Sequence, residues 1–386
     1  MRVPYSYLPR QFADPDSLLK AWKPLVEAGD FTLGPRVEAF EREFAGLHRR
    51  PGREALHAIG VGSGTDAIAM ALEALGVGAG DEVITSPTTF VATAGAVHMV
   101  GARPVFVDID DRYLLDLEKV EGAVTARTRA LLPVHYTGDM VDMQALREMA
   151  DRHGLFVVED ACQAVAAHFD GDPPGTFSHA AAFSLHPLKN LHVWGDGGIV
   201  LTGEAAVAAA IRLQRNHGLI NRDEVAVFGR NSRLHTLQAA VGSLLVGDAE
   251  DDTRARRALA RRFDEAFADL APAVRIPPRE PRSRHVYHLY VLLVERRDEV
   301  LALLEERGVE AKVHYPIPVH LQGAARHLGY GPGDFPRSES YAARALTLPA
   351  NPYLEEAEIA HVIESLRAAV EAVGASGAGR AVPASL

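Results

Sequence analysis

The chain has 386 residues, of which 47% are hydrophobic and 24% are charged, and its formal net charge is −11. That length exceeds the roughly 250–300 residues at which a single core stops growing, so we expect two domains. The negative charge and the lack of a basic run argue against nucleic acid as a partner, because phosphate binding needs a basic face.

The sequence also limits the compartment and the kinds of site. No run approaches the roughly 18 apolar residues of a membrane span, and the first residues lack the apolar core of a signal peptide, so we expect a cytoplasmic protein with no membrane contact. Because Cys162 is the single cysteine, a disulfide within the chain and a cysteine-held metal or iron–sulfur centre are excluded. We expect no metal.

Residues 1–30 predict an N-terminal arm followed by a helix, and residues 31–250 predict a large domain. In this domain short β-rich runs alternate with helix-length segments. The runs are 58–61, 82–85, 104–107, 130–134, 155–158, 181–184 and 198–201. The alternation predicts an α/β fold with a mostly parallel sheet flanked by helices. Fully apolar runs agree with strands that are buried on both faces.

Residues 251–373 predict a smaller C-terminal α+β domain. It includes a strand at 287–294 and a last helix at about 355–372. The small and polar residues 374–386 predict a flexible tail.

Four strand ends carry residues that could bind a ligand, since ligands of open α/β sheets bind beyond the carboxyl ends of the strands. The first end opens a helix with Gly62-Ser-Gly-Thr-Asp-Ala, whose backbone N–H groups could hold a phosphate. Phe90 could stack on a flat ring, and Asp160 adds a carboxylate. Lys189 lies between an apolar run and a glycine-rich turn, where an amine can lose its proton as a Schiff-base lysine requires.

Each feature also has a simpler interpretation. The glycine-rich turn fits a G-x-G-x-x-A dinucleotide pattern, although Glu82, the candidate acid for that pattern, precedes its strand. Lys189 could be a surface lysine, Phe90 a core residue and Asp160 a helix N-cap.

Together the strand ends describe one ligand, pyridoxal phosphate. A phosphate at Gly64 and Ser184, a ring against Phe90, a carboxylate from Asp160 and an amine from Lys189 match what this cofactor needs. The carboxylate would keep the ring nitrogen protonated, and the lysine would hold the aldehyde and later move a proton.

A series of motifs in the same order resembles the sugar aminotransferases of the DegT/DnrJ/EryC1/StrS type, from about residue 31 to residue 366. The motifs on which the resemblance rests include Gly62-Ser-Gly-Thr-Asp-Ala, Pro87-Thr-Thr-Phe-Val-Ala-Thr, Val158-Glu-Asp-Ala-Cys-Gln-Ala, Phe183-Ser-Leu-His-Pro-Leu-Lys-Asn, Gly195-Asp-Gly-Gly and Gly229-Arg-Asn-Ser-Arg-Leu. The resemblance implies an aspartate aminotransferase-like fold, which is fold type I of the pyridoxal phosphate enzymes.

The resemblance implies that glutamate or glutamine donates an amino group, through pyridoxamine phosphate, to a keto-sugar or keto-cyclitol in antibiotic-type biosynthesis. It makes Lys189 the Schiff-base lysine and Asp160 the partner of the ring nitrogen. It also implies a homodimer with shared active sites, in which Asn231 reaches the neighbouring subunit's cofactor. The further cofactor contacts that it implies are Ser63, Gly64, Thr65, Phe90, Gln163 and Ser184.

The run around Lys189 departs from the usual members, because Leu188 and His192-Val-Trp194 stand where threonine and small residues or tyrosine are common. The departure resembles the branch that aminates keto-inositols and keto-glucose phosphates, in aminocyclitol and kanosamine pathways. A nucleotide-linked keto-sugar is the alternative. The candidate substrate contacts are His135, His186, Trp194, Arg233, Tyr315 and His320.

Three other protein classes remain as rivals. A pyridoxamine phosphate dehydratase would have histidine in place of Lys189 and an added iron–sulfur cluster. A non-catalytic sensor with this fold would have no reason to keep the lysine, the carboxylate and the phosphate cradle. An NAD-dependent dehydrogenase is the third.

Overall fold

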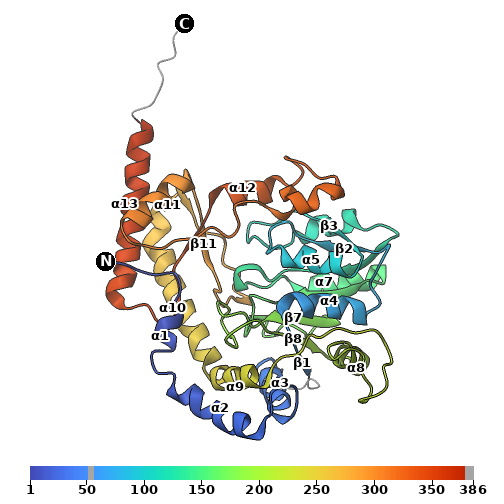
Figure 1. The fold of residues 1–386 in the computed structure, drawn as a ribbon. Helices are drawn as coiled ribbons and strands as arrows, with labels where there is room; N and C mark the ends of the chain where they lie inside the picture. Colours follow the sequence, from blue (N-terminus) through green and yellow to red (C-terminus); the bar gives the residue numbers. More distant parts are fainter. Residues whose placement is uncertain (51–55, 379–386) are drawn as a thin grey trace.

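The computed structural model describes residues 1–50 and 56–378, which form a large α/β domain and a smaller domain beside it (Figure 1). The large domain is built on a seven-stranded sheet in the order β1-β8-β7-β5-β4-β2-β3. Neighbours from β3 to β7 pair in parallel, and β8 is antiparallel to both β7 and β1. The strands are β1 (His57–Val61), β2 (Glu82–Thr85), β3 (Arg103–Phe106), β4 (Thr128–Leu131), β5 (Phe156–Asp160), β7 (Ala180–Ser184) and β8 (Gly198–Thr202).

Both faces of this sheet are covered by helices, as its apolar strands require. In β7, Ala180 and Ala182 join one hydrophobic cluster, whereas Ala181 and Phe183 join another, because successive side chains of a strand point to opposite faces. The first cluster includes α4 (Gly64–Ala74), α5 (Ala92–Met99) and α8 (Ala205–Gln214). The second includes α3 (Pro35–Leu47) and α7 (Met143–His153), and the short α6 (Leu117–Val120) lies between β3 and β4 in the chain.

The smaller domain has an antiparallel sheet in the order β12-β11-β9. Its hydrophobic cluster also takes in Val3, whose N–H donates to the Gly308 carbonyl over 2.8 Å, so the start of the chain belongs to this domain. Its elements are α10 (Ala249–Phe267), β9 (Val274–Arg275), β11 (Tyr290–Val294), α11 (Arg297–Glu306), α12 (Pro336–Arg344), β12 (Ala345–Leu348) and α13 (Glu356–Ala378).

Two further parts connect these domains, the N-terminal segment and a short β-ribbon. The N-terminal segment forms α1 (Leu8–Gln11) and α2 (Asp16–Ala28), and α2 packs on α9 (Thr236–Leu245). A two-stranded ribbon pairs β6 (His168–Phe169) with β10 (Ser283–Arg284).

The α/β architecture with a mostly parallel sheet is confirmed, and each predicted strand of the large domain overlaps an observed one. The predicted tail was wrong at its start, because α13 continues to Ala378 and residues 374–378 are helical. Continuing an existing helix avoids the cost of nucleation, which offsets the poor helix propensity of Gly374 and Gly377. Residues 379–386 of that tail lie outside the described residues. Among the described helices, none has both the length and the apolarity needed to cross a membrane.

Candidate active site

A cavity of about 330 Å³ lies where the carboxyl ends of the parallel strands meet the smaller domain. One side of it is the start of α4. Ser63 caps this helix by accepting the Asp66 N–H over 3.0 Å, and Ser63, Gly64 and Thr65 all line the cavity. A Cβ on Gly64 would come within 2.7 Å of Ser184 Cβ and 2.9 Å of Cys162 Sγ. Glycine is thus needed for the close approach of this helix to β7, and the helix start leaves N–H groups for an anion.

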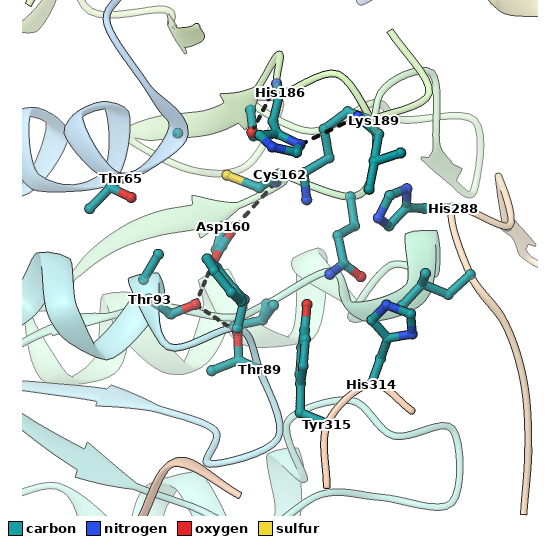
Figure 2. A pocket seen from close by; sticks show the side chains of 18 of the residues that line it. Thr65, Thr89, Thr93, Asp160, Cys162, His186, Lys189, His288, His314 and Tyr315 are labelled. Atoms are coloured by element: carbon teal, nitrogen blue, oxygen red, sulfur yellow. Dashed lines mark hydrogen bonds between the residues drawn. The ribbon is translucent and has the colours of Figure 1, made fainter. Parts of the chain in front are cut away.

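Lys189 lies in the loop between β7 and β8 and reaches the same cavity (Figure 2). Its backbone carbonyl accepts the Tyr7 hydroxyl over 3.4 Å, and the Asn190 amide donates to the Val286 carbonyl over 3.2 Å, so the loop is held between the N-terminal arm and the smaller domain. Burial lowers the pKa of the Lys189 amine, against the raising effects of Cys162 and Asp160. The alternative of an ordinary surface lysine is therefore wrong.

Three further residues face the cavity from the large domain. Asp160 ends β5 and is buried, and turns rather than a helix follow it, so it is not a helix N-cap. Gln163 accepts the Thr137 N–H at its Oε1 over 2.7 Å, which fixes the orientation of its amide. Phe90 is 50% exposed at the cavity rim, which contradicts the alternative of a core residue.

The opposite side of the cavity is aromatic and rich in imidazoles. It comes from the N-terminal arm (Tyr7), the segment before β11 (His288) and the segment after α11 (His314 and Tyr315). Figure 2 shows His288 next to Lys189, with His314 and Tyr315 further from it. Burial lowers the pKa of His288 far below its usual value and lowers the pKa of His314 to about 4, with Lys189 adding to both effects. These imidazoles are neutral at pH 7, so they can donate and accept hydrogen bonds without adding charge.

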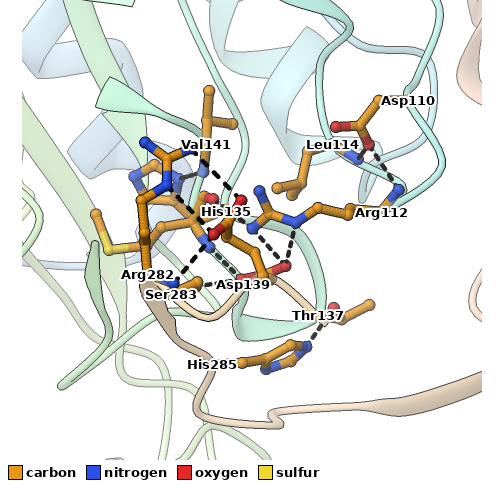
Figure 3. A network of polar contacts seen from close by, with 12 residues as sticks. Asp110, Arg112, Leu114, His135, Thr137, Asp139, Val141, Arg282, Ser283 and His285 are labelled. Atoms are coloured by element: carbon orange, nitrogen blue, oxygen red, sulfur yellow. Dashed lines mark hydrogen bonds and ion pairs between the residues drawn. The ribbon is translucent and has the colours of Figure 1, made fainter. Parts of the chain in front are cut away.

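Among the six expected substrate contacts, His186 and Tyr315 line the cavity, and four lie elsewhere. His135 is fully buried, and its Nε2 lies 2.6 Å from Glu159 Oε2. Figure 3 places it within a polar network in which Arg112 donates to Asp139 Oδ2 over 2.6 Å. The expectation for His135 was wrong, because its ring serves a structural network behind the sheet end.

The expectation for His320 was also wrong. Its side chain is 2% exposed, its Nε2 lies 3.2 Å from Glu339 Oε1, and its ring packs edge-on against Phe335. This contact belongs to a small apolar cluster that joins residues 319–335 to the large domain.

Trp194 and Arg233 do not line the cavity of their own chain either. The Trp194 ring packs edge-on against Phe12 at 4.8 Å and Trp22 at 5.7 Å, which are residues of the N-terminal segment. Arg233 donates to Asn231 Oδ1 and to Asn216 Oδ1, each over 3.0 Å. The unusual residues after Lys189 thus have a packing explanation.

Several cavity residues were missed in the sequence, among them Thr93, Arg256 and His288. Thr93 had a signal, since it follows Thr89 by four residues at the start of a helix. His288 and Arg256 had none, because only the docking of the smaller domain brings them to the cavity.

The residues present fit pyridoxal phosphate. The cavity joins a helix N-terminus that only glycine permits, a buried carboxylate and a partly buried amine with a lowered pKa. Phosphate, protonated ring nitrogen and aldehyde are the three groups of this cofactor that need such partners.

Comparisons with known proteins agree with this chemistry. The model of the "DegT/DnrJ/EryC1/StrS aminotransferase family" matches residues 15–367. The chain belongs to this family. It is therefore an aminotransferase that uses pyridoxal phosphate, of fold type I. The prediction of a transaminase is confirmed, and the dehydrogenase alternative is wrong.

Two curated relatives and one crystal structure show how close the similarity is. A "dTDP-3-amino-3,4,6-trideoxy-alpha-D-glucose transaminase" of Streptomyces venezuelae is 44% identical over 90% of this chain and 91% of its own. A "UDP-N-acetyl-3-dehydro-alpha-D-glucosamine 3-aminotranferase" of Acidithiobacillus ferrooxidans is 37% identical over 91% of this chain and 93% of its own. The structure of S. venezuelae DesV superposes with a TM-score of 0.92 at 41% identity, covering 96% of this chain and 99% of that one.

Proposed function

We propose that this aminotransferase moves the amino group of glutamate or glutamine to the 3-keto group of a nucleotide-linked hexose. The observation that carries the proposal is the similarity along nine tenths of the chain to two proteins whose names specify a nucleotide-linked sugar and position 3. This similarity supports the nucleotide-linked alternative better than the keto-cyclitol expected from the run after Lys189. The packing of Trp194 on Phe12 and Trp22 removes the main argument for the cyclitol.

In this proposal the large-domain side of the cavity holds the cofactor. Ser63, Gly64, Thr65 and Ser184 bind the phosphate, Phe90 lies against the ring, and Gln163 lies near the ring hydroxyl. Asp160 keeps a proton on the ring nitrogen, since it is a buried carboxylate at the cavity floor. When bound, pyridoxal phosphate supplies an electron sink for the carbon that loses its proton.

Lys189 is the residue that binds the cofactor covalently and moves the proton. Burial already lowers the pKa of its amine, so less free energy is needed to obtain the neutral form that accepts a proton. His186, His314 and Tyr315 line the remaining space and are the candidates for contacts with the sugar.

We also propose a homodimer with shared active sites. The loop between α8 and Asn231 exposes Ile220 by 59%, Val225 by 51%, Val227 by 44% and Phe228 fully. Apolar side chains gathered so densely on one loop need a cover, and a second copy would supply it. Asn231 follows this loop directly, so the same contact would carry it toward the partner's cofactor.

The substrate proposal can be tested in the reverse direction, which avoids unstable keto-sugars. Holoenzyme is mixed with a dTDP- or UDP-linked 3-amino-hexose, or with scyllo-inosamine or a 3-amino-glucose phosphate. Conversion of bound pyridoxal phosphate to pyridoxamine phosphate is followed by loss of visible absorbance. We expect the nucleotide-linked amines to react at least 100-fold faster in kcat/KM. Faster reaction of either compound without a nucleotide would contradict the proposal.

Phe228→Asp tests the dimer, measured by sedimentation velocity. We expect the wild type to sediment as a dimer and the variant as a monomer with weaker cofactor retention. A dimeric Phe228→Asp variant would contradict the placement of this loop at the interface. Val26→Asp, which changes an exposed apolar residue in α2, serves as the control.

A further inference from the structure

Two buried threonines connect the start of α5 to the Asp160 carboxylate. Thr93 is fully buried and its hydroxyl donates to Asp160 Oδ2 over 2.7 Å, as Figure 2 shows. The Thr89 hydroxyl lies 2.6 Å from that of Thr93, and Thr89 is 4% exposed. The other carboxylate oxygen, Oδ1, accepts the Cys162 N–H over 3.1 Å. Both oxygens of Asp160 therefore have a donor on the protein.

The direction of proton donation along this chain is fixed. The Thr93 hydroxyl donates to Asp160 Oδ2, which uses its single hydroxyl proton. Thr93 then has only its lone pairs left for Thr89, and Thr89 must donate its own proton. The order Thr89 to Thr93 to Asp160 places two aligned dipoles behind the carboxylate, in a site where the dielectric screening is weak.

The contact is not a local helix interaction. Thr89 lies in the turn before α5 and Thr93 lies in its first turn, and their hydroxyls meet because this turn folds back on the helix start. Asp160 is 67 residues further along the chain and ends β5. A threonine hydroxyl at a helix start usually bonds to its own backbone, whereas this one reaches across to a neighbouring strand.

We propose that Thr93 is a positioning residue that holds Asp160 ionised and turned toward the ring nitrogen of the cofactor, with Thr89 as the second link. The proposal rests on the role given to Asp160 above, and it does not depend on which sugar is the acceptor. Without the Thr93 hydroxyl, the carboxylate loses a charge-assisted hydrogen bond, keeps the Cys162 N–H at Oδ1, and takes up the proton itself more readily.

The test measures the dissociation constant of pyridoxal phosphate by reconstitution of apoenzyme, together with the pH dependence of the visible absorbance. Thr93→Val keeps the shape of the side chain and removes the hydroxyl. We expect a dissociation constant at least tenfold higher and a shifted absorbance titration, as loss of a hydrogen bond to a charged group implies. Thr93→Ser should restore both within about threefold, and Thr89→Val should raise the constant about threefold.

Thr88→Val is the matched control. Thr88 is 5% exposed and its hydroxyl has no hydrogen-bond partner among the described residues, so its removal should leave both readouts unchanged. An equal loss of affinity in Thr88→Val and Thr93→Val would assign the effect to packing and overturn the proposal. If Thr93→Val does not fold, Thr93→Ser and Thr89→Val still decide, and unchanged values in Thr89→Val would remove the second link.

A double-mutant cycle shows whether Thr93 acts through Asp160. Asp160→Asn should weaken cofactor binding more than Thr93→Val, and adding Thr93→Val to Asp160→Asn should cause little further loss. Full additivity would overturn the proposal for Thr93 while leaving Asp160 in place. Unchanged binding in Asp160→Asn would instead show that the proposed role of Asp160 is wrong, so the two failures can be told apart.

Discussion

The two sides of the cavity differ in origin and in chemistry. The large-domain side carries fixed polar groups at the ends of strands or starts of helices, such as Gly64, Asp160 and Lys189. The side formed by the arm and the smaller domain carries mostly aromatic rings and neutral imidazoles, such as Tyr7 and His314, together with the guanidinium of Arg256. Charged partners suit a cofactor that is the same for every substrate, whereas neutral donors and acceptors suit a polyhydroxyl substrate.

Because the two sides differ, we expect substitutions on them to have different effects. Changes on the large-domain side should alter cofactor binding and every substrate alike. Changes on the smaller-domain side should alter the Michaelis constant for the sugar and leave the cofactor in place. Variants on the two sides of the cavity test this division.

The largest effect is expected for Lys189→Ala. Without its amine the enzyme lacks both the covalent link to the cofactor and the group that moves the proton, so turnover should fall by at least about 10⁴. Rapid-mixing assays and the visible spectrum measure this. Lys312→Ala is the control, since Lys312 is exposed and paired with Glu310 over 2.8 Å, and its activity should stay near the wild type. Substantial turnover by Lys189→Ala would contradict the assignment.

Gly64→Ala should come next. The new methyl group would stand 2.7 Å from Ser184 Cβ, and such overpacking typically costs about 1–3 kcal/mol. We expect cofactor affinity to fall about tenfold or more, measured by reconstitution of apoenzyme. Gly95→Ala in α5 meets nothing within 4 Å and should instead stabilise the protein slightly. Equal affinities in the two variants would place the phosphate elsewhere.

Tyr315→Phe tests the other side. Its hydroxyl lies in the cavity opposite Asp160, and loss of one hydrogen bond to the sugar should raise the Michaelis constant about tenfold. The dissociation constant of pyridoxal phosphate should not change. Tyr330→Phe removes a hydroxyl that accepts the Phe106 N–H outside the cavity, and it serves as the control. A higher dissociation constant of pyridoxal phosphate in Tyr315→Phe would show that the two sides are not separate in function.

The same division explains what the sequence could reveal. Strand ends of a parallel sheet converge by topology alone, so the positions of Gly64, Asp160 and Lys189 along the chain were enough to assign them to one site. His288 reaches the cavity only through docking of the smaller domain, and no local pattern encodes that. That Trp194 does not line the cavity of its own chain was hidden for a related reason, because an aromatic next to a catalytic motif gives no sign of which distant helix it packs against.

Neutral buried histidines also occur far from the cavity. His48 is one of them, and we expect it to affect the stability of the fold but not the binding of cofactor or substrate. It is 1% exposed, its Nδ1 lies 3.1 Å from the Phe44 carbonyl, and burial lowers its pKa from 6.5 to about 4. Between these two values the unfolded chain binds more protons than the folded one, so the free energy of unfolding falls as the pH falls from 6.5 toward 4. By pH 4.5 the contribution of His48 to this loss is roughly 2–3 kcal/mol.

His48→Gln lacks this acid penalty. The stability difference between wild type and variant should therefore be largest above pH 6.5 and should shrink as the pH falls to 4.5. Denaturant midpoints at pH 7.5 and 4.5 measure it, with apoenzyme used to keep cofactor loss out of the comparison. Parallel pH dependence of the two proteins would mean that His48 titrates normally in the folded state. Cofactor affinity at pH 7.5 should be the same in both, because this imidazole serves the core behind the sheet and neither side of the cavity.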